Sequence, residues 1–157
     1  MTPDELARLI EQYRAGIEAE LSLLRRLADV SGQQRSVTHA RDFQAFGATA
    51  DERDHIMRSL VTIEDDLRTV RLTLTAHRDL AAGTPGFDEV AALHREAADL
   101  VASILRTDQA SLSALADAEL AHRSAVASLE RGETTLAAYR RVLAPPVSSA
   151  TLVNRRG

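Results

Sequence analysis

Apolar residues recur at intervals of three and four positions along three long stretches of the chain. This interval is the period of an α-helix with one narrow apolar face, and it differs from the alternation of a β-strand. The pattern predicts an all-α fold, a long antiparallel helical hairpin with a further N-terminal helix, packed as a coiled-coil-like bundle. The first stretch contains Leu6, Ile10, Tyr13, Ile17, Leu21, Leu24 and Leu27. The others contain Ile56, Leu60, Ile63, Leu67, Val70 and Leu74, and then Leu93, Ala97, Leu100, Ile104, Leu115, Val126 and Leu129.

Capping residues place the start of the first helix. Thr2 and Glu5 have the spacing of a capping box, and Pro3 between them suits the first helical position. Ser31-Gly32 is a stop signal for this helix, and continuation toward Gln34 is the alternative. We therefore expect a helix from residue 3 to about residue 31, with a polar connector after it.

Polar residues, a second capping box and a glycine- and proline-rich segment predict the bounds of the connector and of the two later helices. Residues 31–48 are polar, and within them residues 41–46 are expected to form a short helix. Its two phenylalanines, Phe43 and Phe46, are expected to pack against the bundle, and a pair that faces a partner is the alternative. A capping box from Thr49 to Glu52 predicts the start of the second helix, which should end near Ala82. After the breaker Gly83-Thr84-Pro85-Gly86, a third helix is expected from Pro85 to Arg131.

The last part of the chain differs from the rest in charge. From Arg131 onward five arginines and one glutamate give a net charge of +4, which leaves −8 for the rest. Beyond Gly132, a weak helical position, the apolar residues keep a helical spacing: Leu136, Tyr139 and Leu143. We therefore expect a helical bundle over residues 1–131 and a C-terminal amphipathic helix with a flexible basic tail over 132–157. Such an end favours an interaction segment, and the alternative is an ordinary solvated helix end.

Composition narrows the classes of function. The chain has no cysteine, which excludes disulfides, thiolate metal sites and cysteine nucleophiles. All 19 basic residues are arginine, but the net charge of −4 argues against nucleic-acid binding. The N-terminus lacks the basic and apolar regions of a signal peptide, and the longest uncharged run, residues 142–154, is too short to span a bilayer. We expect a soluble, cytoplasmic protein without membrane insertion.

One arrangement of acidic residues and histidines matches a metal site in spacing. Glu52-x-x-His55 and Glu119-x-x-His122 resemble the paired motifs of ferritin-like di-iron bundles, and Glu20 lies on the apolar face of the first helix. However, a capping box already accounts for Glu52, and the fourth helix that such a site needs is missing. The alternative is that these residues set helix register or face solvent. Without a nucleotide-binding loop, a nucleophile elbow or a catalytic triad, we expect neither an enzyme nor a cofactor.

Asp108 interrupts the apolar face of the third helix. A buried carboxylate is costly unless it is paired or hydrated, so Asp108 should have a partner. The sequence leaves three arginines as candidates for that partner: Arg25, Arg26 and Arg53.

Several segments of the sequence carry a family resemblance. They are Leu9 to Leu24; Arg41-Asp42-Phe43 with residues 51–60; residues 104–108 with Leu112 and Leu115; Leu129-Glu130-Arg131-Gly132; Ala138-Tyr139-Arg140; and the terminal Asn154-Arg155-Arg156-Gly157. In these segments the chain resembles the flagellar type III export chaperones, of the FlgN type and its FliT-like relatives. The stretch from Gly132 to Tyr139 and the Arg-Gly terminus are the more specific part.

The resemblance implies a cytoplasmic chaperone of flagellar assembly. Such a protein binds subunits of the hook–filament junction or the filament cap, prevents premature assembly and escorts them to the export gate. It also implies that the C-terminal segment holds the cargo and that Tyr139 contacts the gate. Leu136, Tyr139 and Leu143 would then anchor a cargo helix, while Arg140 and Arg141 would steer the segment toward acidic cargo. The alternative function is a structural coiled-coil adaptor whose apolar faces form a homodimer.

Overall fold

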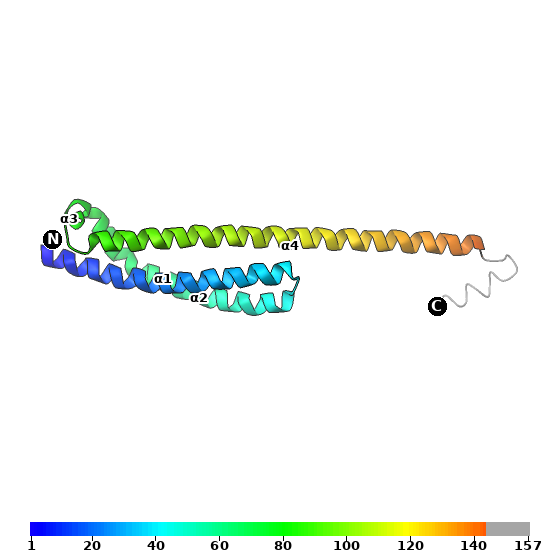
Figure 1. Cartoon of the computed structure of the whole chain (residues 1–157), viewed down its shortest axis with the longest axis horizontal. Helices are drawn as coiled ribbons and strands as arrows, with labels where there is room; N and C mark the ends of the chain where they lie inside the picture. Colours follow the sequence, from blue (N-terminus) through cyan, green and yellow to red (C-terminus); the bar gives the residue numbers. More distant parts are fainter. Residues whose placement is uncertain (144–157) are drawn as a thin grey trace. The chain divides into compact units, whose positions relative to one another are not determined.

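The computed structural model describes residues 1–143, and this part of the chain is helical without a strand. Four helices follow one another: α1 (Pro3–His39), α2 (Phe43–Ala76), α3 (Arg78–Ala82) and α4 (Phe87–Leu143). The predicted all-α fold is confirmed (Figure 1). The chain divides into two units, Met1–Leu115 and Ala116–Gly157, which we describe separately. Among residues 1–143, none of the helices has the length and apolar character needed to cross a membrane.

The first unit is a bundle in which α1 and α2 form an antiparallel pair and α4, up to Leu115, packs on it (Figure 1). Every member of the predicted apolar face of α1 is buried, which confirms that prediction. One part of the core joins all four helices: Leu6, Ile10, Tyr13, Leu67, Val70, Leu74, Ala81 and Val90. The other part joins α1, α2 and α4: Ile17, Leu21, Leu24, Leu27, Val30, Ile56, Ala97 and Ile104.

The start of α1 follows the predicted capping box. The Thr2 hydroxyl accepts a hydrogen bond from the Glu5 backbone N–H, and the Glu5 carboxylate accepts one from the Thr2 N–H. These bonds satisfy backbone donors that a helix end otherwise leaves free, so the helix start is fixed locally.

The predicted end of α1 at Ser31 is wrong, because the helix continues to His39. Ser31, Gln34 and Thr38 are all buried and continue the inward face at helical spacing. Ser31 and Gln34 accept hydrogen bonds from Arg53, a half-buried arginine of α2 described below, and Thr38 donates its hydroxyl hydrogen to the Gln34 carbonyl. The expected connector over residues 31–48 is therefore mostly helix.

The α1–α2 connection is much shorter than expected. Arg41 adopts a positive φ of 57°, and Asp42 caps α2 by accepting a hydrogen bond from the Ala45 N–H. The expected capping box at Thr49–Glu52 thus lies inside α2, and no separate helix precedes it. Phe43 is 52% exposed, so its expected packing against the bundle is wrong, whereas Phe46 is half-buried.

The breaker between the second and third expected helices is confirmed, with one refinement. Helix α2 ends at Ala76, and the short α3 carries the chain to Ala82 before the turn. Gly86 has a φ of 90°, which glycine adopts without the steric cost that a side chain adds. Helix α4 then begins at Phe87 and stays α-helical through Gly132 to Leu143, because one exposed glycine costs a helix only about 1 kcal/mol.

Candidate partner-binding sites

An apolar groove of about 490 Å³ lies between α2 and α4, with α1 as its floor. The floor carries Ile17, Leu24 and Leu27, and the two walls carry Met57 and Leu60 of α2 and Ala98, Val101 and Leu105 of α4. The backbones of α1 and α2 approach closely, whereas α4 packs on this pair at a larger backbone separation. That separation leaves the groove walls partly uncovered. Met57 and Val101 are each 42% exposed, and Leu105 is 63% exposed.

One end of the groove holds a bidentate ion pair. Arg71 donates to both oxygens of Glu64, with N–O distances of 2.6 and 3.0 Å. It also donates to the Tyr13 hydroxyl at 3.3 Å, and its guanidinium lies 5.7 Å from the centre of the Tyr13 ring. The hydrogen bonds from Arg71 lower the pKa of Glu64 to about 2, so this carboxylate stays ionised. The Tyr13 hydroxyl lies 3.5 Å from His94 Nδ1, which brings α1, α2 and α4 together here.

Glu20 is a buried carboxyl beside this pair. Its side chain lines the groove, the residue is only 4% exposed, and its Oε1 has no hydrogen-bond partner among the described residues. Burial, followed by the hydrogen bond to Glu64 and the charge of Glu64, raises the pKa of Glu20 to about 7. A protonated Glu20 can donate to Glu64, whereas an ionised Glu20 lacks a donor at Oε1. The floor of the groove therefore carries a charge that is costly to develop.

The raised pKa of Glu20 makes stability depend on pH. Between about pH 4.5 and pH 7 the folded chain keeps a proton that the unfolded chain releases, so the contribution of Glu20 to stability falls as the pH rises through this window. We expect Glu20→Gln to raise the free energy of unfolding at pH 8 by about 2 kcal/mol, and to change it little near pH 4.5. Urea unfolding at the two pH values checks this. An equal effect at both values would contradict a protonated Glu20.

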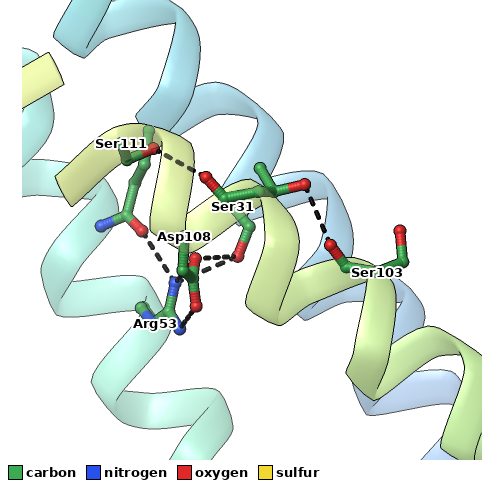
Figure 2. A network of polar contacts seen from close by, with 7 residues as sticks. Ser31, Arg53, Ser103, Asp108 and Ser111 are labelled. Atoms are coloured by element: carbon green, nitrogen blue, oxygen red, sulfur yellow. Dashed lines mark hydrogen bonds and ion pairs between the residues drawn. The ribbon is translucent and has the colours of Figure 1, made fainter. Parts of the chain in front are cut away.

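The other end of the groove is closed by an ion pair between α2 and α4. Arg53 donates to Asp108 through both terminal nitrogens, at 2.7 and 2.5 Å, and Figure 2 shows Ser31 of α1 beside them. Arg53 also donates to Ser31 Oγ and to Gln34 Oε1, each at 3.0 Å. The hydrogen bonds from Arg53 lower the pKa of Asp108 and hold it ionised. The expected partner of Asp108 is thus Arg53.

The remaining two arginines considered for Asp108 have other partners. Arg25 pairs with Glu96 at 2.7 Å, and Arg26 lies 3.8 Å from Glu52, in both cases with exposed side chains. The signal for Arg53 was available in the sequence. Ser31, Gln34 and Thr38 continue the apolar spacing of α1 as polar residues, which indicates a buried polar group facing them.

The second unit provides a helical segment with exposed leucines. Within residues 116–138, Leu120 is 64% exposed, Leu129 is 74% exposed and Leu136 is 68% exposed. Leu136 is one of the five residues expected to bind a partner, and its exposure leaves it available for contact. The other four belong to the helical backbone of α4, but their side chains lie outside the described residues: Tyr139, Arg140, Arg141 and Leu143.

The four residues of the two Glu-x-x-His motifs do not form a metal site in the structure. Glu52 and His55 are exposed within α2, and Glu52 lies near Arg26. Glu119 and His122 are also exposed, and Glu119 pairs with Arg123. In the part of the chain that the structure describes, no three acidic or histidine side chains gather as metal ligands would. Comparisons with protein-family models, curated proteins and solved structures give no match to this chain.

Proposed function

We propose that this chain is a cytoplasmic, non-enzymatic export chaperone of the flagellar type. It binds a subunit of the hook–filament junction or the filament cap through helix–helix contacts, prevents its early assembly and delivers it to the export gate. The observation that carries the proposal is the exposure of Leu120, Leu129 and Leu136 on one helical segment. The sequence resemblance supports the class of cargo, and by that resemblance Tyr139 contacts the export gate.

The physical basis of capture is the burial of these leucines against an amphipathic cargo helix. Each leucine that becomes buried contributes about 1.5–3 kcal/mol from the removal of apolar surface from water. A cargo helix that is exposed before assembly gains the same protection, so the complex hides two apolar surfaces at once. Arg140 and Arg141 add positive charge to this end of the chain, which favours association with acidic cargo.

Charged substitutions in the segment test cargo capture. We expect the double change Leu129→Glu and Leu136→Glu to weaken cargo binding about 100-fold, because two apolar contacts of about 1.5 kcal/mol each are lost. A chain that ends at Arg131 should lose binding as well. The measurement is recovery of flagellar junction or cap subunits from native cell lysate by tagged protein, read by mass spectrometry, followed by titration of the purified cargo.

The matched control places the same charges on equally exposed leucines of the first unit. Leu72 in α2 is 65% exposed and Leu80 in α3 is 60% exposed, so Leu72→Glu with Leu80→Glu should leave cargo binding unchanged. Full binding by the Leu129 and Leu136 variant would show that cargo binds elsewhere. If both tagged proteins, the full chain and the chain ending at Arg131, recover only untagged copies of this chain, the result would instead favour the homodimeric coiled-coil adaptor.

A further inference from the structure

We infer that the groove between α2 and α4 is a second docking site, which accepts an amphipathic helix of a partner protein that presents one arginine or lysine to Glu20. The residues that line this groove belong to the first unit, and the inference does not depend on the identity of the cargo. Three features of the groove support it: its dimensions, its apolar walls and the buried carboxyl group of Glu20, whose Oε1 has no hydrogen-bond partner among the described residues.

The length of the groove fits a helix. On α4 its lining residues extend from His94 to Asp108, a distance of about 21 Å at ~1.5 Å per residue. On α2 they extend from Arg53 to Arg71, which is about 27 Å by the same measure. These lengths correspond to about four to five turns of a docked helix. The wall residues Val101 and Leu105 are spaced by one helical turn, as in grooves that receive helical peptides.

The charges that line the groove define the polar feature of its occupant. Arg53 is paired with Asp108 at one end, and Arg71 is paired with Glu64 at the other. Glu20 lies on the floor beside the Arg71–Glu64 pair, and it forms no ion pair of its own among the described residues. One basic side chain on an apolar helix face would supply the donor that Glu20 Oε1 lacks, since arginine and lysine reach past apolar neighbours with their long stems. The occupant therefore needs a single positive charge within an apolar face.

Two synthetic peptides separate charge recognition from simple apolar binding. Both are fluorescein-labelled, 18-residue helical peptides with leucines along one face, and they differ only in a central residue of that face. One carries arginine, and the other carries citrulline, which has nearly the same shape without the charge. Binding to the full chain is measured by fluorescence anisotropy at pH 8, above the pKa of Glu20 of about 7. We expect the arginine peptide to bind about tenfold more tightly.

Two sets of variants locate this preference. Glu20→Gln keeps the shape of the side chain and should reduce the tenfold preference to about onefold. Leu105→Glu places a charge on the groove wall and should weaken both peptides at least tenfold. Its matched control is Leu112→Glu on the same helix, where the leucine is 60% exposed and does not line the groove. That variant should bind both peptides normally.

The outcomes that overturn the inference are specific. Equal binding of the two peptides to the unmodified chain would remove the role of Glu20. Equal effects of Leu105→Glu and Leu112→Glu would show that the peptides bind outside the groove. Loss of peptide binding in the variant with Leu129→Glu and Leu136→Glu would show that the peptides bind the exposed segment of the second unit instead. Circular dichroism of each variant confirms that the bundle is folded, so a loss of binding is assigned to the altered surface.

Discussion

Replacing Arg53 with methionine should lower the free energy of unfolding by about 3 kcal/mol, because Asp108 would remain in the interior without its counter-charge. The two side chains are only 25% and 21% exposed, and Ser31 and Gln34 would lose the same donor. Urea unfolding at pH 7, followed by circular dichroism, measures the change. This is the largest effect that we expect from a single polar residue of the bundle.

Two controls separate the buried pair from ordinary surface charge. Arg25→Met removes an arginine whose side chain is 60% exposed, so its loss should cost less than about 1 kcal/mol. Adding Asp108→Leu to Arg53→Met should recover much of the lost stability, since an apolar pair of similar volume often replaces a buried ion pair at little cost. A cost for Arg25→Met equal to that of Arg53→Met would contradict the importance of burial.

The same variant has a pH signature. In the unmodified chain the pKa of Asp108 is lowered by Arg53, so this carboxylate contributes stability above its unfolded pKa of 3.8 and the contribution is lost as the pH falls below that value. Without Arg53, burial raises the pKa of Asp108 and only the hydrogen bond from Ser31 still lowers it. We expect burial to outweigh this one hydrogen bond, so Asp108 of the variant should take up a proton at a higher pH than Asp108 of the unmodified chain. The deficit of Arg53→Met should therefore shrink between pH 7 and pH 4. A constant deficit would indicate lost packing instead of an unpaired charge.

Gly16→Ala should destabilise the bundle by about 2 kcal/mol, although alanine favours helices by about 1 kcal/mol over glycine. A Cβ at position 16 would lie 2.8 Å from Leu67 Cγ and closer still to both Cδ atoms, so α1 and α2 would have to separate or repack. Urea unfolding of the single variant measures the cost. Glycine at this position lets the two helices approach, which the sequence alone presents as an interruption of the apolar face.

Two controls test the explanation for Gly16→Ala: a second glycine of the same helix, Gly32, and the residue that Gly16 contacts, Leu67. A Cβ at position 32 would have open space around it, with no neighbouring atom within 4 Å, so Gly32→Ala should stabilise by up to about 1 kcal/mol. In a double-mutant cycle with Leu67→Ala, the new methyl group at position 16 should become much less costly, because the space it needs is vacated. Equal effects at the two glycines, or strict additivity with Leu67→Ala, would contradict close packing at Gly16.

The sequence by itself determined the all-α class, the start of α1 and the residues of its apolar face. Each depends on short-range information. A capping box acts within four residues, and helical spacing states which residues share a face whatever that face contacts. The break at residues 83–86 belongs to the same group, because glycine and proline act on the local backbone. The candidate segment near Leu136 was proposed from its helical spacing, its positive charge and the family resemblance, and its partner binding stays a prediction.

The tertiary structure decided what covers each face. From the sequence, the polar residues near the end of α1 were predicted to form a connector. In the structure Ser31 and Gln34 are part of the helix and contact Arg53, which is about twenty residues away in the chain. Glu20 was visible on an apolar face, but its neighbour Glu64 and its place in the groove depend on the separation of α2 from α4. The need for glycine at position 16 follows from the close approach of Leu67, which belongs to another helix. Periodicity assigns residues to a face, and only the packing of distant segments determines whether that face is core, groove or open surface.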